Sequence, residues 1–102
     1  MTLRELLEDC AKSLPDVSAE TAAGATTWSS KGRPFATLSA DGSSVGFALD
    51  SAVASAAART PDALLSSRGH GWVAFRPENL DEGAADRAAA WFASAYRRLG
   101  SG

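Results

Sequence analysis

The sequence contains little of the side-chain chemistry that cross-links a chain or holds a metal ion. It has one cysteine, Cys10, and one histidine, His70. A single cysteine cannot form an internal disulfide, and structural zinc takes four ligands of these two types. We therefore expect no metal site and no cofactor. Cys10 falls within an amphipathic pattern, so we interpret it as a small hydrophobic residue and not as a reactive thiol.

Long hydrophobic runs are also absent. Residues 1–14 include acidic side chains such as Glu5 and Asp9, so this segment fits neither a signal peptide nor a membrane span. A chain with one cysteine also suits the reducing cytoplasm. The sequence therefore predicts a cytoplasmic protein that makes no contact with a membrane.

Neither sign of charge dominates the chain. Ten basic side chains stand against 12 acidic ones, for a formal net charge of −2. This balance removes the usual electrostatic reason to propose a nucleic-acid-binding protein. The length of 102 residues, with 45% hydrophobic and 22% charged residues, predicts one globular domain over residues 1–102. Alanine supplies 22 of these residues, so the core depends on few large side chains.

Hydrophobic periodicity and capping residues predict eight elements in the order α-β-β-β-α-β-β-α. They are a helix over 3–14, strands over 25–29, 35–39 and 45–49, a helix over 51–59, strands over 64–68 and 72–76, and a last helix that begins after Asn79 or Asp81 and ends at Gly100. Residues 15–20 are interpreted as a turn. This order predicts an α+β fold in which helices flank a single, mainly antiparallel, five-stranded sheet.

Glycine and proline positions predict how the strands are joined. Lys31-Gly32 and the segment 69–71 have the composition of tight reversals. Asp41-Gly42 is the strongest turn signal, because a type I′ turn needs positive φ at both central residues. Pro34 is acceptable only at a strand start or a sheet edge, since proline cannot donate to a strand ladder.

Five short motifs in this order carry a resemblance to a known family. They are Leu14-Pro15, the segments 31–38 and 45–50, Gly71-Trp72-Val73 and Ala95-Tyr96-Arg97. With them the chain resembles the MmcQ/YjbR-like family of small bacterial α+β proteins, over nearly its whole length. The resemblance implies a YjbR-like single domain. It also implies DNA binding through a double-wing shape, a label that itself rests on shape for most members.

The distribution of charge suggests which residues would contact DNA. Residues 28–76 carry five basic and three acidic side chains, whereas both flanking segments are acidic overall. The candidate contacts to nucleic acid are Lys31, Arg33, Arg68, His70 and Arg76. Two basic hairpin tips would straddle a phosphate backbone, with weak, nonspecific affinity and a salt slope of about −4. The alternative is that these tips are charged only because they are exposed.

The three tryptophans suggest a second kind of site. Trp91 lies on the apolar stripe of the last helix and is expected in the core. Trp28 and Trp72 would line a groove for a flat small molecule, such as an aromatic metabolite, if helices leave them uncovered. Otherwise both fill the space left by alanine-rich helices. A homodimer that hides an exposed aromatic face is a third possibility, beside a monomer.

Catalysis has the least support in the sequence. His70 lies between two glycines and has no neighbouring nucleophile in a glycine-framed elbow, so we interpret it as a turn residue. No combination of nucleophile, base and orienting acid follows from the spacing of residues. The sequence therefore predicts a noncatalytic binding protein, either for DNA or for a small aromatic molecule.

Overall fold

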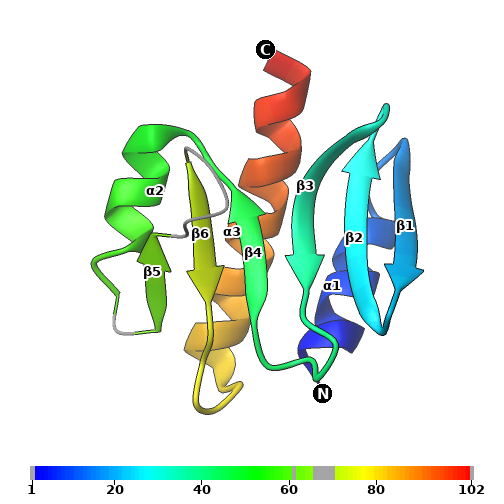
Figure 1. Cartoon of the computed structure of the whole chain (residues 1–102). Helices are drawn as coiled ribbons and strands as arrows, with labels where there is room; N and C mark the ends of the chain where they lie inside the picture. Colours follow the sequence, from blue (N-terminus) through cyan, green and yellow to red (C-terminus); the bar gives the residue numbers. More distant parts are fainter. Residues whose placement is uncertain (1, 61, 66–70, 102) are drawn as a thin grey trace.

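The computed structural model describes residues 2–60, 62–65 and 71–101 (Figure 1). These residues form an α+β fold with three helices and one sheet of six strands. The elements are α1 (Leu3–Lys12), β1 (Val17–Ala22), β2 (Ala25–Ser30), β3 (Arg33–Leu38), β4 (Val45–Ala48), α2 (Ser51–Ala57), β5 (Ala63–Leu65), β6 (Trp72–Phe75) and α3 (Glu82–Ser101). The strand order is β1-β2-β3-β4-β6-β5, and all neighbours are antiparallel.

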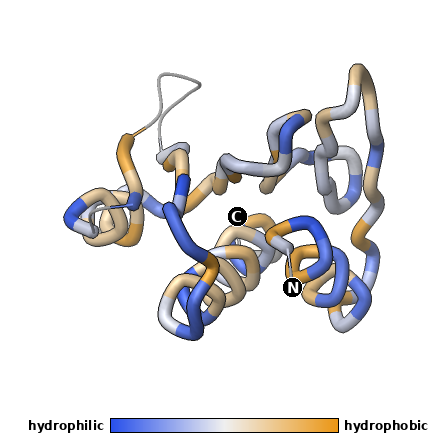
Figure 2. The backbone as a smooth tube through the Cα atoms, turned by 90° about the horizontal axis from the view of Figure 1, so that it is seen from below, coloured by the Kyte–Doolittle hydropathy of each residue, from blue (hydrophilic) through white to orange (hydrophobic). Residues whose placement is uncertain are grey.

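The helices cover the two faces of the sheet unequally. Figure 2 shows α1 and α3 side by side against one face, which we call the inner face. Helix α2 lies beside β5, at one edge of the sheet (Figure 1). None of the described helices covers the opposite face, which we call the open face. The fold therefore has two layers, and one of its surfaces is a bare sheet.

The core lies between the inner face and the two long helices. Helix α1 contributes Leu3 and Leu7, while α3 contributes alanines and Phe92. The ring of Phe92 packs edge-on against Trp28 at 5.7 Å and against Phe35 at 5.1 Å between centroids. Edge-to-face pairs at these distances are favourable beyond the area that they bury. A few aromatic side chains thus fill a core that alanine alone would leave thin.

The sheet has one strand more than the sequence predicts. The segment interpreted as a turn over 15–20 instead enters β1, which pairs with β2 from Val17 opposite Ser30 to Ala22 opposite Ala25. Ala23 and Gly24 join the two strands with φ values of 53° and 85°. Positive φ at both positions is the backbone of a type I′ hairpin turn. The strand gave no alternating pattern because nearly all of its residues are exposed.

The hairpin at Asp41-Gly42 forms, but its predicted turn type is wrong. Only Gly42 has positive φ, at 75°, whereas a type I′ turn needs it at Asp41 as well. The N–H of Gly42 donates to the carbonyl of Ser39 at 2.9 Å, and the N–H of Ser39 donates to the carbonyl of Ser44 at 2.9 Å. Asp41 accepts hydrogen bonds from Ser39 and Ser43, which stabilise this wider loop.

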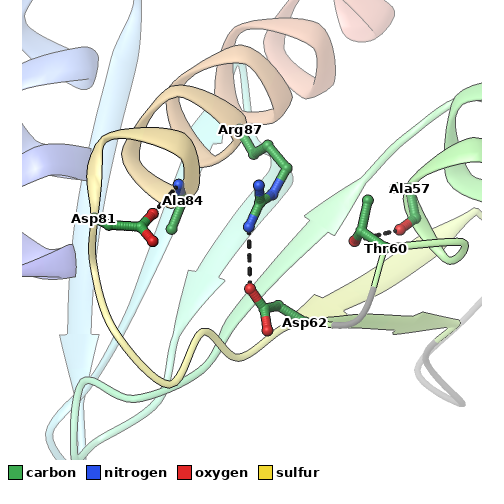
Figure 3. A network of polar contacts seen from close by, with 6 residues as sticks. All are labelled: Ala57, Thr60, Asp62, Asp81, Ala84 and Arg87. Carbon is green, nitrogen blue, oxygen red and sulfur yellow. Dashed lines mark hydrogen bonds and ion pairs between the residues drawn. The ribbon is translucent and has the colours of Figure 1, made fainter.

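Several local expectations agree with the structure. Lys31 and Gly32 have φ values of 53° and 81°, so this tight reversal is confirmed. Pro34 lies at the start of β3, before the pairing with β4 begins at Ala36. The carboxylate of Asp81 caps α3 by accepting from the N–H of Ala84 at 2.8 Å (Figure 3).

The bounds of several elements differ from the expectations: α1 ends at Lys12 and not at residue 14, and α2 ends at Ala57 and not at residue 59. Helix α3 continues to Ser101, so the helix does not end at Gly100 as predicted. Strand β5 is described only from Ala63 to Leu65, because residues 66–68 of the expected strand lie outside the described part of the chain.

Candidate functional site

Five segments of the chain meet at one end of the sheet. The start of β1 pairs with the end of β2, through Val17 opposite Ser30. The N–H of Leu49, just after β4, donates to the carbonyl of Gly71, just before β6, at 2.8 Å. The hydroxyl of Tyr96 in the last third of α3 donates to the carbonyl of Pro15 at 2.8 Å. Figure 1 shows the β2–β3 turn and the end of α3 at this same end of the molecule.

Basic side chains gather at this end of the sheet, which we call the basic pole. They come from the end of α1, the β2–β3 turn and the end of α3. The basic pole comprises Lys12, Lys31, Arg33, Arg97 and Arg98. Three acidic residues, Asp9, Asp16 and Asp50, lie at the same end, so the pole is positive overall. Asp50 makes a weak ion pair with Arg98, at 3.6 Å between Nε and Oδ1, in which Asp50 is largely exposed and Arg98 partly exposed.

Acidic side chains predominate at the opposite end, which we call the acidic pole. It holds the start of α1, the 39–44 loop and the segment between β6 and α3 (Figure 1). These segments carry Arg4, Glu5, Asp41, Arg76, Glu78, Asp81 and Glu82. Asp62 lies beside Arg76, whose N–H donates to its carbonyl at 2.8 Å, and pairs with Arg87, so six acidic side chains stand against three basic ones at this pole. Charge is thus separated along the strand direction, although the chain as a whole is nearly neutral.

Arg76 lies at the acidic pole and not beside the other predicted cations. It follows β6, whose last residue Phe75 pairs with Val45, and Val45 pairs with the end of β3 at Leu38. Arg33 begins the same strand β3 at the other end. The grouping of Arg76 with Lys31 and Arg33 is therefore wrong, because the four residues of β6 carry the chain from one end of the sheet to the other.

Arg76 instead contributes to the field around Asp41. Hydrogen bonds from the Ser39 hydroxyl, the Ser43 N–H and the Ser43 hydroxyl lower the pKa of Asp41 to about 2, and the positive charge of Arg76 adds to the effect. These donors stabilise the ionised carboxylate. Asp41 therefore organises the 39–44 loop as a permanent anion at neutral pH.

Only one of the two hairpin tips of the predicted double wing lies within the described residues. Lys31 and Arg33 are both exposed on the β2–β3 tip. Arg68 and His70, the predicted contacts of the second tip, lie outside the described residues. The adjoining ends of β5 and β6, at Leu65 and Trp72, lie at the basic pole, where the register pairs Trp72 with Ala48. One tip can therefore be described, and it belongs to the basic pole.

The two tryptophans of the predicted groove lie on opposite faces of the sheet. Trp28 is 1% exposed on the inner face, where Phe92 covers it. Trp72 alternates with the inner-facing Val73 and lies against Gly46 on the open face. The shared Trp28–Trp72 groove is therefore wrong. Trp28 supports the core instead, because α3 leaves space that only a large ring fills.

The open face has a shallow depression of its own beside Trp72. It has a volume of about 270 Å³ and lies over β2, β3, β4 and β6, toward the end of the sheet that holds the 39–44 loop. Its walls are small side chains and hydroxyls from Ala25, Thr27, Thr37, Leu38, Ser39, Ser44, Gly46 and Ala74. Such a surface can accept an uncharged ring and offer hydroxyl hydrogen bonds to it.

The remaining reactive groups do not form a cluster. Burial raises the pKa of the Cys10 thiol, and the neighbouring Asp9 carboxylate raises it further. Residues 2–60, 62–65 and 71–101 include no group of three histidine, cysteine or carboxylate side chains able to hold a metal ion. No helix in these same ranges is long and apolar enough to cross a membrane.

Lys12, Arg97 and Arg98 belong to the basic pole, although the regional charge sums of the sequence do not point to them. Residues 77–102 are acidic overall, and this sum hides the two arginines at the end of α3. The available signal was their position near the C-terminal end of a helix, together with the expectation that helices pack along the strands.

Comparison of the chain with models of protein families, with curated proteins and with solved structures gives no match. The resemblance to the MmcQ/YjbR-like family therefore stays a prediction from sequence motifs. The α+β class and the mainly antiparallel sheet agree with the expected architecture, and the sixth strand does not.

Proposed function

We propose that the protein is a noncatalytic binding protein that holds nucleic acid weakly and without sequence preference at its basic pole. The observation that carries this proposal is the separation of charge along the strand direction. Five basic side chains from three distant segments gather at one end of a chain whose net charge is −2. A local field of this kind attracts a polyanion even where the total charge does not.

The geometry of the β2–β3 tip supports the same partner. Lys31 lies in the two-residue turn and Arg33 directly follows it; both side chains are exposed, and neither forms an ion pair or hydrogen bond with another described residue. Unpaired exposed cations release counterions when they meet phosphates, which is the source of nonspecific affinity. With about four phosphate contacts, the logarithm of the binding constant should fall with the logarithm of salt concentration at a slope of about −3.6.

A pair of charge-matched double variants tests this proposal. Lys31→Gln/Arg33→Gln removes two charges from the basic pole, and Arg59→Gln/Arg76→Gln removes two exposed charges that do not belong to it. Fluorescence anisotropy with duplex and single-stranded DNA at low salt should show about tenfold weaker binding for the first variant. Its salt slope should also fall by about 1.8, while the control keeps the slope of the parent protein.

Two results would contradict the proposal. One is the absence of binding to either DNA at tens of micromolar protein in low salt. The other is equal weakening by the two double variants, which would mean that only the total charge matters. The proposal gives Cys10 no catalytic role, because burial and the Asp9 carboxylate raise the pKa of its thiol and keep it protonated.

The depression on the open face favours a second candidate, a site for a small flat molecule. Trp72 lies beside its Gly46 wall, so a bound ring would alter the emission of this indole. Titration of the intrinsic fluorescence with a panel of aromatic metabolites would detect such a ligand. The change should disappear in Trp72→Leu and persist in Trp91→Phe. No quenching and no thermal shift with any compound would reject this candidate.

A further inference from the structure

The two edges of the sheet are protected to different degrees. Strand β5 has three residues and lies beside α2, so it offers little backbone to a partner (Figure 1). Strand β1 has six residues, pairs with β2 without a bulge and is exposed along five of its six residues. It contains neither lysine nor proline, the residues that most often protect an edge. Strand β1 is therefore an open edge along its whole length.

The turn between β1 and β2 decides which backbone groups of β1 face outward. In a two-residue turn the carbonyl of the first flanking residue accepts from the N–H of the last, so Ala22 and Ala25 form a hydrogen-bonded pair. Hydrogen-bonded and non-bonded pairs then alternate along an antiparallel ladder. Ser18 and Glu20 consequently direct their backbone groups toward β2. Val17, Ala19 and Thr21 direct theirs to the free edge.

This alternation restricts how a second copy of the chain could pair with the edge. Antiparallel pairing about a two-fold axis must join outward-directed residues, such as Ala19, with outward-directed residues of the other copy. Placing Ala19 opposite Ala19 also brings Val17 opposite Thr21 at both ends. Each of these three pairs can exchange two backbone hydrogen bonds. The same arrangement sets Glu20 opposite Ser18 of the other copy, where the carboxylate meets a hydroxyl.

A neighbouring antiparallel register, reached by moving each strand one residue relative to the two-fold axis, is disfavoured by charge. It would bring Glu20 directly opposite Glu20 of the second copy, and like charges in that position destabilise a sheet. Moving the strands in the other direction would bring Pro15 opposite Thr21, where proline has no N–H to donate. One register therefore combines the most hydrogen bonds with no electrostatic conflict.

The separation of charge favours the same partner. Because the two β1 strands run in opposite directions, the basic pole of each copy comes beside the acidic pole of the other. Helix α1 shows the same separation of charge within one copy, because Glu5 in its first turn lies at the acidic pole and Lys12 in its last turn lies at the basic pole. Antiparallel placement of two such dipolar molecules is electrostatically complementary.

We propose that the free edge of β1 binds β1 of a second copy, with Ala19 opposite Ala19, to form a homodimer with one continuous sheet. The interface consists of strand edges and is small, so its association should be weak and concentration-dependent. The proposal does not depend on nucleic-acid binding, because the β2–β3 tips of the two copies stay exposed at opposite ends of the dimer.

Sedimentation equilibrium over about ten to several hundred micromolar protein measures the association directly. The average mass should rise toward twice 10.5 kDa as the concentration increases. Ser18→Lys places an ammonium group opposite Glu20 of the other copy and should strengthen association. Ser18→Glu introduces a second carboxylate there and should weaken it. A monomer throughout this range, or equal behaviour of the two Ser18 variants, would overturn the proposal.

Disulfide trapping tests the register independently of affinity. In a Cys10→Ser background, Ala19→Cys brings two thiols together across a hydrogen-bonded pair, with Cα atoms about 5.5 Å apart. That separation lies within the range for a disulfide. The matched control Thr21→Cys separates its two thiols by four residues along the strand, or about 13 Å. Oxidation should therefore give covalent dimer from Ala19→Cys alone, and preferential trapping of Thr21→Cys would contradict the register.

Circular dichroism of each variant establishes that it remains folded. Ala19 and Thr21 are exposed edge residues, so neither substitution removes a core side chain. If nucleic-acid binding fails while dimerisation succeeds, only the proposed function is rejected, and the reverse result rejects only the dimer.

Discussion

Trp72 lies directly over Gly46 on the open face of the sheet. A Cβ atom at position 46 would stand 3.5 Å from Cε3 of the indole and 2.7 Å from Oγ1 of Thr37. The missing side chain therefore leaves room for two neighbours at once. This close approach also shapes the depression beside Trp72, because Gly46 and Thr37 both line it.

Gly46→Ala should destabilise the protein by about 1 kcal/mol, because Thr37 must move to avoid the new methyl group. In a Thr37→Ala background the same substitution should be neutral or stabilising by about 0.5 kcal/mol, since alanine restricts the unfolded chain more than glycine does. Urea denaturation of the four proteins gives the coupling between the two positions. Equal effects of Gly46→Ala in both backgrounds would contradict the crowding at Thr37.

The ion pair between α3 and the β5 side of the sheet allows a second test. Nη2 of Arg87 donates to Oδ2 of Asp62 at 3.0 Å (Figure 3). The guanidinium also lies 5.8 Å from the ring centre of Phe75. Asp62→Ala should cost about 1–2 kcal/mol, because it leaves a partly buried charge without its acceptor.

Arg87→Met serves as the comparison for that substitution. It retains an apolar stem over Phe75 and removes the charge, so its cost should be smaller, about 0.5–1 kcal/mol. The double variant should be no less stable than Asp62→Ala alone. Thermal unfolding of the three variants measures these differences, and a larger loss in Arg87→Met would show that packing outweighs the ion pair.

Asp41 should contribute to the pH dependence of stability. Its pKa is about 2 in the folded protein, below the ordinary value of 3.8. The group therefore stabilises the folded state above pH 4, and this contribution is lost as the pH falls from about 4 to about 2. Asp41→Asn should flatten the stability profile in that window and leave the profile above it parallel to that of the parent.

Carbon-detected NMR titration of the Asp41 carboxyl group provides the direct measurement. A midpoint close to that of an unfolded peptide would contradict the hydrogen bonds from Ser39 and Ser43. Ser39→Ala should raise the pKa of Asp41, because it removes the first of the donors that hold the carboxylate.

The different environments of the tryptophans should be visible in fluorescence quenching. Acrylamide should reach Trp72, which is half-buried on the open face, and should not reach Trp28, which is 1% exposed. Trp72→Phe should therefore lower the quenchable fraction of the emission, whereas Trp28→Phe should raise it. Trp28→Phe should also lower the free energy of unfolding by about 1–3 kcal/mol, because it leaves a cavity beside Phe92.

Local signals in the sequence predicted those parts of the fold that depend on neighbouring residues. The capping box at the start of α1 is one of them, with Glu5 N–H donating to Thr2 Oγ1 at 3.2 Å and Thr2 N–H donating to Glu5 Oε1 at 3.1 Å. Strand β1 was missed because its side chains are exposed and give no hydrophobic alternation. The only local sign of β1 was the Ala23-Gly24 turn that follows it. A single weak turn signal does not predict a strand whose residues show no hydrophobic alternation.

The sequence by itself determined the α+β class, the β2–β3 hairpin, the starts of most elements and the few aromatic residues available for the core. These features depend on backbone preferences and on periodicity over a few residues. Only the tertiary structure decided which charges share a pole and which tryptophan lies in the core. Lys31 and Arg97 are distant in the chain and meet at one pole, whereas Arg76 is carried to the other by β6. Such relationships follow from how strands and helices pack, and no local pattern encodes them.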